Sequence, residues 1–388
     1  MKPSTKSEVE DLLAPLVAFR RDVHTHPELG FKETRTAALV GDALRARELD
    51  VHTGIGGTGV VGVLRAGSSQ RCIALRADMD ALAIEEETAL PYASRNRGVF
   101  HGCGHDGHMA MLLGAAQHLS RTRRFDGTVN FIFQPAEEGL GGARAMIADG
   151  LFERFPADQV YALHNWPDLP AGTAMTRPGP IMAAADKFEI VVEGSGGHAA
   201  QPHKTPDAIL AASELVSQLH TIVSRHIPPT ASAVLSVTRI EGGHAHNVLP
   251  AAVRLMGTVR SFDPLIQDRI EGSMRQIAGG LAMASGTKIE VSYDRYYPVT
   301  RNDPDAANEA LAAASCVCRH AAVAPEPAFT SEDFAFMLPA KKGAYLWLGQ
   351  GRPGTNAPLH HPSYDFNDDV IGLGVAWYVA LAERLLSA

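Results

Sequence analysis

The sequence predicts an α/β protein in which a mainly parallel sheet is flanked by helices, with a smaller α+β domain inserted into it. Two observations lead to this fold class. Apolar runs of strand length alternate with helix-like segments over residues 1–181, as in domains built on parallel sheets. Over residues 182–294 the order becomes β-α-β-β-α-β, which is typical of a ferredoxin-like unit. The first pattern then resumes, so we expect residues 1–181 and 295–388 to form one domain around the insert.

Each element of the larger domain follows from local periodicity. Apolar residues at helical spacing predict helices at residues 11–21, 33–47, 109–119, 141–148, 305–319 and 370–386. Short apolar runs predict strands at residues 59–65, 72–77, 128–133, 159–163 and 344–348. Several polar residues capable of chemistry follow these strands or begin these helices. Open α/β sheets build their sites at such positions.

The insert is predicted in the same way. Alternating or continuous apolar runs predict strands at residues 187–192, 232–240, 252–260 and 288–293. Longer amphipathic stretches predict helices at residues 206–225 and 264–284.

Composition excludes several classes of function. The chain has 388 residues and a net charge of −8, with both signs interspersed, so we expect no nucleic-acid partner. The first ten residues are polar and lack the apolar core of a secretory signal. No segment is long and apolar enough to span a bilayer, so we expect a cytoplasmic protein with no membrane partner. Four cysteines are too few for a disulfide framework at this length.

Residues 101–108, with the sequence HGCGHDGH, concentrate side chains that bind metals. Glycines on both sides of Cys103 allow the thiol and the imidazole of His105 to turn toward one point. A Cys-x-His pair alone is weak evidence, because a single free thiol usually only packs in the core. We interpret His101 and His108 as supporting residues rather than ligands.

Glu137 and Glu138 follow a buried strand, and this position makes the pair informative. Adjacent residues after a strand point in different directions, so one carboxylate can bind metal while the other faces the reacting water. Hydrolysis needs this division between a Lewis acid and a proton carrier. A Glu-Glu pair alone is usually a solvated face, with roughly one chance in ten of being catalytic. The interpretation gains weight because His164 is expected to end another strand and His105 to begin a helix.

Motifs along nearly the whole chain resemble those of a known family. They are RDVHTHPEL (21–29), LRADMDAL (75–82), HGCGHDGH (101–108), QPAEEG (134–139), HN (164–165), GHAAQPH (197–203), GGHAHNVLP (242–250), SEDF (331–334) and LHHP (359–362). The chain resembles the metal-dependent amidohydrolases and peptidases that include hippurate hydrolases, aminoacylases, auxin-conjugate hydrolases and glutamate carboxypeptidases. The nearest branch is that of the N-acyl-amino-acid amidohydrolases, or hippurate hydrolases.

The resemblance implies a centre with two divalent metal ions. The positions that match the family's ligands are Cys103, His105, Glu138, His164 and His360. Glu137 matches the general base, and Asp80 matches a carboxylate that orients the site from behind the ligands. His361 is adjacent to His360, and the residue after the leucine is the one that matches. Manganese or zinc is expected, with cobalt or nickel as alternatives, because this ligand set does not select one metal.

The insert resembles the family's lid and dimerisation domain, which implies a homodimer or a tetramer. In relatives, the histidine that matches His198 reaches the active site of a second subunit and stabilises the oxyanion. Residues that match Asn247 and Arg260 face the substrate. A guanidinium such as that of Arg260 can bind a carboxylate with two hydrogen bonds. An unpaired charge on a surface strand explains Arg260 equally well if the resemblance is ignored.

These implications lead to one expected activity, the hydrolysis of an amide that joins an acyl or aroyl group to an amino acid. Glu137 would move the proton from water to the departing amine, and the small-molecule product would be a free amino acid. Two alternatives stay open. A dipeptidase or carboxypeptidase would use the same centre on a substrate with a different end group. A catalytically silent binding protein would keep the fold without hydrolysis, although the intact Glu137 argues against it.

Overall fold

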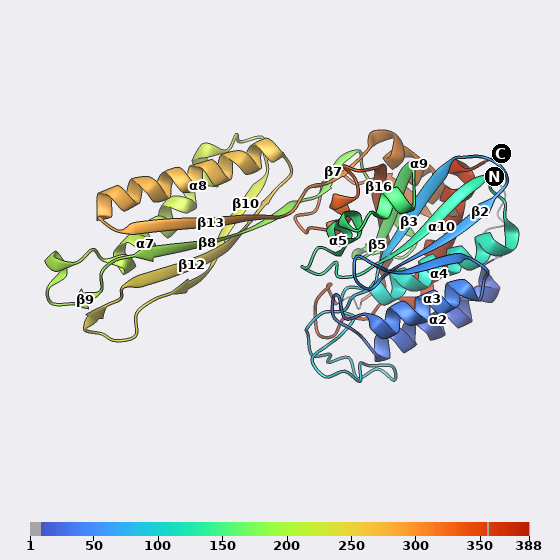
Figure 1. The fold of residues 1–388 in the computed structure, drawn as a ribbon, viewed down its shortest axis with the longest axis horizontal. Helices are drawn as coiled ribbons and strands as arrows, with labels where there is room; N and C mark the ends of the chain where they lie inside the picture. The colour runs from blue at the N-terminus through green and yellow to red at the C-terminus, as the bar shows by residue number, and fades with distance from the viewer. Residues whose placement is uncertain (1–8, 355–356, 388) are drawn as a thin grey trace. The chain divides into compact units, whose positions relative to one another are not determined.

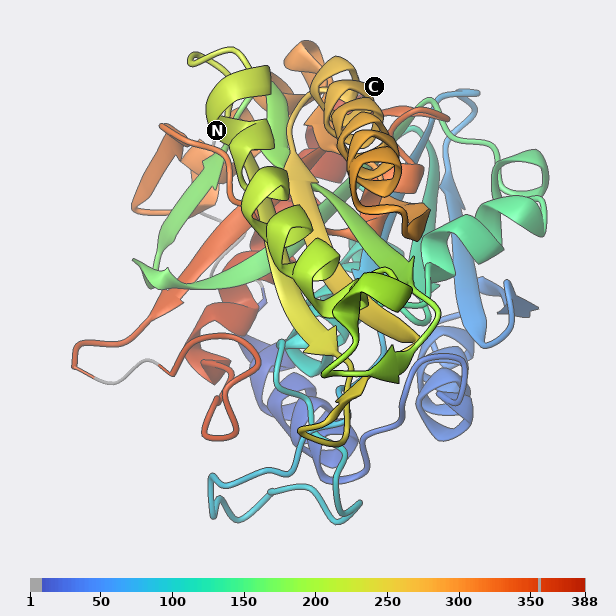
Figure 2. The ribbon, with the colours of Figure 1, turned by 90° about the vertical axis from the view of Figure 1, so that its left-hand side faces the viewer.

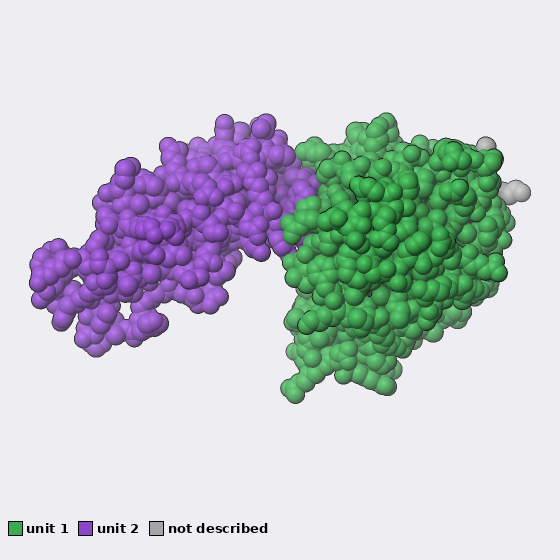
Figure 3. Space-filling view, in the orientation of Figure 1, with its two compact units in different colours: residues 1–181, 301–326, 333–388 green, residues 182–300, 327–332 purple. Residues whose placement is uncertain are grey.

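The computed structural model describes residues 9–354 and 357–387, so most of the polar N-terminal stretch lies outside the described residues. The described chain forms two compact units, coloured separately in Figure 3. Unit 1 comprises Met1–Ile181, Arg301–Glu326 and Asp333–Ala388, and unit 2 comprises Met182–Thr300 and Pro327–Glu332. The chain thus enters unit 2 at Met182. It returns at residue 301 rather than 295 and makes one further short excursion.

Unit 1 is built on an eight-stranded sheet (Figure 1). In spatial order its strands are β1 (Asp50–Ile55), β2 (Gly59–Ala66), β4 (Gly127–Gln134), β3 (Cys72–Asp78), β5 (Gln159–Pro170), β16 (Lys342–Gly351), β6 (Thr173–Thr176) and β15 (His320–Val323). The central strands β4, β3, β5 and β16 are parallel. All residues of β4 are buried, as expected for a strand covered on both faces. The predicted α/β class with a mainly parallel sheet is therefore confirmed.

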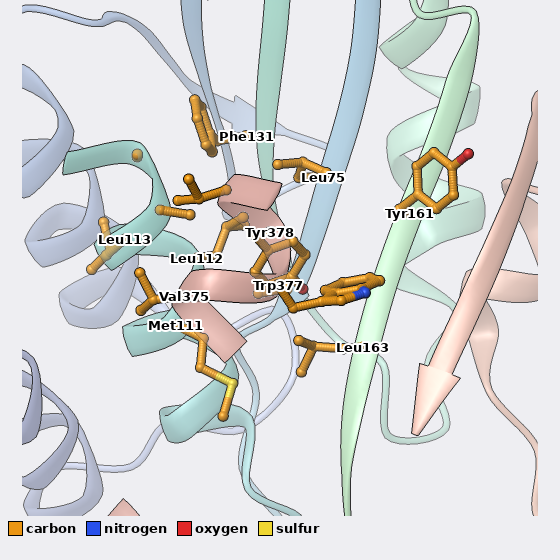
Figure 4. Close-up of a cluster of buried hydrophobic side chains, with 14 of the residues drawn as sticks. Leu75, Met111, Leu112, Leu113, Phe131, Tyr161, Leu163, Val375, Trp377 and Tyr378 are labelled. Carbon is orange, nitrogen blue, oxygen red and sulfur yellow. The ribbon is translucent and has the colours of Figure 1, made fainter. Parts of the chain in front are cut away.

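Helices pack against this sheet, and the hydrophobic core of unit 1 lies between them and the strands. They are α2 (Glu10–Thr25), α3 (Thr34–Arg45), α4 (His105–Thr122), α5 (Gly142–Ala148), α6 (Leu151–Arg154), α9 (Pro304–Val317) and α10 (Ile371–Leu385), with 3₁₀ turns η3 (Asp333–Phe336) and η4 (Asp368–Val370). Figure 4 shows the aromatic side chains of α10 among apolar residues of α4 and the sheet. Their polar atoms are satisfied, because Trp377 donates to the Ala310 carbonyl at 3.0 Å and Tyr378 to the Arg76 carbonyl at 2.7 Å.

Unit 2 has the strand order expected of a ferredoxin-like unit. Its strands β10 (Ala233–Glu241), β12 (Ala252–Ser261), β8 (Ala184–Glu193) and β13 (Lys288–Tyr297) are neighbours in that order and all antiparallel. Helices α7 (Ala208–Leu219) and α8 (Pro264–Ser285) lie on one face of this sheet (Figure 2). Smaller elements are β9 (Gly197–His198), β11 (Val248–Leu249), η1 (Pro202–Lys204) and the π-helical turn η2 (Ile222–His226). Strands β7 (Gly179–Met182) and β14 (Thr300–Asn302) pair where the chain leaves and re-enters unit 1.

Several element boundaries differ from those expected. Helix α4 begins at His105, as the position of that histidine predicted, although the apolar periodicity predicted a helix only from residue 109; Gly104 precedes it in the left-handed region at φ +96°. Strand β5 continues past His164 to Pro170, because its pairing with β16 extends that far. The helix expected at residues 206–225 ends at Leu219 and is followed by the turn η2.

Among the described residues, every helix is too short or too polar to cross a membrane.

Candidate metal centre

The candidate site of unit 1 lies where β3 and β4 end and α4 begins. Asp78 and Gln134 are the last residues of the two strands, and they are paired neighbours in the parallel ladder. Both carboxyl ends therefore deliver their loops to one place. Gly104 allows α4 to start beside them, since an added Cβ there would lie 2.3 Å from the Asn165 side-chain oxygen.

One group of predicted ligands comprises Cys103, His105 and His164. One donor atom from each lies within 4.8 Å of the other two, and all three residues are buried. The Cys103 Sγ is 3.4 Å from the His164 Nε2. The other ring nitrogen of His164 lies 2.7 Å from the Asn165 carbonyl oxygen, which leaves Nε2 as the atom aimed at the thiol.

A second group comprises Cys103, Glu138 and His360, again with donor atoms within 4.8 Å of one another. The His360 Nε2 is 3.1 Å from the Glu138 Oε1. His360 has a left-handed backbone at φ +65°, and its N–H donates to the Gly102 carbonyl at 2.8 Å. A non-glycine residue in that region is typical of sites where strain is tolerated for function. All five predicted ligands thus fall into two groups that share Cys103.

His361 is oriented differently from His360. Its Nδ1 accepts a hydrogen bond from the Ser363 backbone N–H at 3.1 Å. It belongs to none of the groups of potential ligands found among the described residues. The geometry therefore favours His360, as the motif does.

Two buried atoms in these groups make no well-aligned hydrogen bond with the described residues, although the His360 Nε2 is close to one of them. They are the His105 Nε2 and the Glu138 Oε1, which are 3.9 Å apart. Leaving such atoms unsatisfied costs roughly 1–3 kcal/mol each. A cation bound by both would satisfy them, so the donor set fits a metal.

The buried carboxylates around these groups also favour a bound positive charge. Burial, followed by the charges of Glu138 and Glu137, raises the pKa of the Cys103 thiol well above its ordinary value. Although burial opposes it, the carboxylates of Asp78 and Asp80 raise the pKa of His105 to about 10. Without a metal, a proton on His105 therefore balances the carboxylates. A divalent cation can replace that proton and stabilise the thiolate.

His164 is neutral, the form that binds metals. Burial lowers its pKa well below the ordinary value, and the nearby His108 and His105 lower it further, although Asp78 opposes them.

A third group, Asp78, His105 and His108, also has donor atoms within 4.8 Å. The donor atoms of Asp78 and His108 in this group are already hydrogen-bonded, however. The Asp78 oxygens lie 2.8 Å from the Arg76 Nη1 and 2.6 Å from the His108 Nδ1. The remaining His108 nitrogen, Nε2, is 2.6 Å from the Asn165 Oδ1. This arrangement agrees with a supporting role for His108.

Glu137 is buried, and one of its oxygens lies within 4.8 Å of donor atoms of His105 and Glu138. Asp80 holds the loop that carries both glutamates. Its two oxygens accept the backbone N–H groups of Glu137 at 2.9 Å and Glu138 at 2.8 Å. The buried Glu33 accepts the preceding N–H, that of Ala136, at 2.8 Å. Three successive N–H groups are thus fixed by carboxylates, which sets the direction of the glutamate pair.

Sequence reasoning missed the roles of Arg76, Glu33 and Tyr364. Arg76 is fully buried and binds Asp78 and Asp333, and Tyr364 accepts a hydrogen bond from the Asn165 side chain at 2.8 Å. One signal was available in the sequence. An arginine inside an otherwise apolar strand must be paired, because an unpaired buried charge is very costly.

Unit 2 brings two of its three predicted site residues together. His198 is the last residue of β9, which pairs with β11, and the Ala199 N–H donates to the Asn247 carbonyl at 3.0 Å. Both residues are exposed. Arg260 is half-buried near the far end of β12, and its guanidinium donates to the Val259 carbonyl at 2.9 Å. Arg260 is eight residues from the start of β12, roughly 27 Å at 3.4 Å per residue, whereas Asn247 precedes that start, so the three residues do not converge within unit 2.

Comparisons with known proteins show the family of the chain. A model of peptidase family M20/M25/M40 matches residues 74–384. The chain is 41% identical to the hippurate hydrolase of Campylobacter jejuni and 37% identical to an N-acetylcysteine deacetylase of Bacillus subtilis. The alignment with the hippurate hydrolase covers 98% of this chain and 98% of the relative. The alignment with the deacetylase covers 96% of this chain and 97% of the relative.

One solved relative is a Bacillus subtilis protein that is described as a dinuclear metal binding peptidase of the M20 family. It superposes with a TM-score of 0.85 at 33% identity, covering 97% of this chain and 99% of that one. The chain belongs to peptidase family M20/M25/M40 and is a metal-dependent amidohydrolase.

Proposed function

We propose that the protein hydrolyses the amide bond of N-acyl or N-aroyl amino acids such as hippurate, releasing a carboxylic acid and a free amino acid. The observation that carries this proposal is the position of Glu137. Its carboxylate lies within 4.8 Å of donor atoms of His105 and Glu138, one residue from each of the two groups that contain Cys103, and neither of these groups needs it for its three donors. The names of the hippurate hydrolase and the N-acetylcysteine deacetylase support this substrate class.

Two divalent ions, manganese or zinc, would be held by the two groups. Cys103, His105 and His164 would hold one, and Cys103, Glu138 and His360 would hold the other. When bound, such ions supply positive charge that polarises a carbonyl and makes water more acidic. Cobalt and nickel would also fit this mixture of nitrogen, oxygen and sulfur ligands.

The protein's own residues would move the proton and hold the substrate. Glu137 would accept a proton from the attacking water and later donate it to the departing amine nitrogen. The imidazole of His198 would stabilise the oxyanion, and Asn247 and Arg260 would bind the substrate carboxylate.

The separation of these residues within unit 2 bears on the oligomeric state. Because Arg260 lies far along β12 from His198 and Asn247, one subunit would not apply all three residues to one substrate. We propose a homodimer in which unit 2 acts as lid and dimerisation domain and His198 serves the site of the second subunit. A tetramer would contain the same pairing. The cytoplasmic location stays a prediction from the sequence.

A panel of substrates tests the activity. The protein is stripped with a chelator, reloaded separately with manganese, zinc, cobalt or nickel, and assayed with hippurate, N-acetyl amino acids and dipeptides. We expect metal-dependent release of amino acids from the N-acylated substrates.

A dipeptidase or carboxypeptidase is the second candidate, because the solved relative from Bacillus subtilis is described as a peptidase. A free substrate amine needs an acidic partner, whereas an acyl group does not. Preference for dipeptides over every N-acylated substrate would therefore overturn the proposed substrate class. Absence of hydrolysis with all four metals would overturn the proposed activity.

A further inference from the structure

The carboxylate of Glu137 is held by a contact that the proposed mechanism does not use. Its Oε1 accepts a hydrogen bond from the backbone N–H of Asp333 at 3.2 Å. Asp333 is the first residue of the turn η3 and lies 196 positions away in the sequence. The terminal torsion of a glutamate is otherwise broad, so this contact limits the direction in which the carboxylate faces.

The side chain of Asp333 explains why this N–H stays in place. Its carboxylate is completely buried. Oδ1 accepts hydrogen bonds from the Gln134 Nε2 at 2.7 Å and the Arg76 Nη2 at 3.1 Å. Oδ2 accepts one from the Ala143 backbone N–H at 2.9 Å. The side chain is thus fixed to β4, β3 and the start of α5.

Arg76 makes this arrangement electrostatically stable. The guanidinium is completely buried and also binds Asp78 at 2.8 Å. Its charge attracts both carboxylates, and one Asp333 oxygen lies within 4.8 Å of oxygens of Glu137 and Glu332. Hydrogen bonds that involve a charged group are roughly twice as strong as neutral ones. The Asp333 side chain is therefore held firmly, and with it the backbone N–H that faces Glu137.

We propose that Asp333 is a positioning residue for Glu137. Its side chain, bound by Arg76, Gln134 and Ala143, holds its backbone N–H against the Glu137 carboxylate and so directs the proton carrier. The proposal rests on the proposed role of Glu137 as general base. A misplacement of about 1 Å can cost about 100-fold in rate.

Asp333→Asn is the direct test. The groups described above that contact the Asp333 oxygens are all donors, so the NH₂ group of asparagine would face a donor and lose a hydrogen bond. We expect kcat to fall about 10- to 100-fold, with KM within about twofold and the metal content of the reloaded protein unchanged. Asp126→Asn is the matched control. Asp126 also accepts two backbone N–H groups, those of Ser68 and Ser69 at 2.7 Å, but it lies at the opposite end of β4. Its kcat should stay at the wild-type value.

Gln134→Met covers the case in which Asp333→Asn fails to fold. It removes one donor to Asp333 and the acceptor of the Arg76 Nε, but it leaves the ion pair between Asp333 and Arg76. It should lower kcat by a smaller factor at unchanged KM and metal content. Wild-type kcat in a folded Asp333→Asn protein, or in Gln134→Met when that is the only folded variant, would overturn the proposal. So would a loss of kcat that is fully explained by lost metal.

A double-mutant cycle separates positioning from a general structural effect. If Asp333 acts through Glu137, adding Asp333→Asn to Glu137→Gln should lower the residual kcat by less than about twofold. The same cycle applies to Gln134→Met. An equal loss in both backgrounds would show that the residue acts elsewhere. High activity of Glu137→Gln alone would instead overturn the role of Glu137 and the positioning proposal with it, so the two failures are distinguishable.

Discussion

Cys103 is the residue on which both candidate ligand groups depend, because each group loses its sulfur if Cys103 is removed. That Cys103 and His105 are candidate ligands can be predicted from the sequence, because glycines and metal-binding side chains are adjacent in residues 101–108. Arg76 and Asp333 are not predictable in this way. Their ion pair joins positions 257 residues apart, and only the fold brings them together. Local motifs therefore indicate the candidate ligands but not the residues that hold them in place.

Replacing Cys103 should lower metal content. We expect Cys103→Ala to bind fewer metal ions per chain than the wild type, because both groups lose a shared ligand, and to lose most of its activity. Cys72→Ala is the control, since Cys72 contacts Pro156 and Asn130 and belongs to neither group. Elemental analysis after dialysis measures the difference. Equal metal content in the two variants would remove Cys103 from the ligand set.

His24 gives the protein a pH-dependent contribution to stability. Although burial opposes it, hydrogen bonds to Asp106 and Glu86 raise the pKa of His24. A pKa that is higher in the folded state gives stability below the unfolded pKa of about 6.5, and this stability is lost as pH rises through the folded value.

The advantage of the wild type over His24→Gln in free energy of unfolding should therefore be largest near pH 6 and shrink toward pH 9. Urea denaturation of the metal-free proteins measures it without interference from pH-dependent metal binding. A difference that is constant over this range would show that His24 contributes through packing alone.

At the scale of elements, long apolar segments were predicted well, while short ones and boundaries were not. Strand β4 and helix α10 are strongly apolar and lie where expected. The four-residue strands β6 and β15 were missed because so few residues carry no usable periodicity. His164 lies within β5 rather than at its end, since the partner strand β16 determines how far β5 extends.

Gly104 precedes helix α4, whose first residue is His105. Gly104→Ala should destabilise the protein by roughly 2–4 kcal/mol, because alanine is strained at φ +96° and its Cβ would collide with Asn165. Gly279→Ala is the control. Gly279 lies inside α8 with nothing within 4 Å of an added Cβ, so the substitution should stabilise by about 0.5–1 kcal/mol. Denaturant midpoints measure both, and equal shifts would contradict the capping role of Gly104.

At the scale of the whole molecule, the two units divide the proposed work. The five proposed metal ligands and Glu137 belong to unit 1, whereas His198, Asn247 and Arg260 belong to unit 2. The sequence revealed the insert because its order of elements differs from the surrounding pattern. It could not reveal how far Arg260 lies from His198, because that distance depends on the pairing of β12 with its neighbours.

Mixing two inactive variants tests the proposed exchange of His198 between subunits. A dimer of one His198→Ala chain and one Glu137→Gln chain would contain one complete site. After unfolding and refolding of an equimolar mixture, random pairing should restore about a quarter of wild-type activity. Each variant refolded alone is the control. No recovery in a mixture shown to contain mixed dimers would mean that His198 does not serve the second subunit.

The measurement that tests the central claim most directly is the metal content and kcat of Glu137→Gln beside those of Glu138→Gln. If Glu137 is the proton carrier and Glu138 a ligand, Glu137→Gln should keep its full metal content while kcat falls about 100- to 10,000-fold. Glu138→Gln should lose metal. Near wild-type turnover in Glu137→Gln, or a loss of metal from it equal to that of Glu138→Gln, would contradict the account.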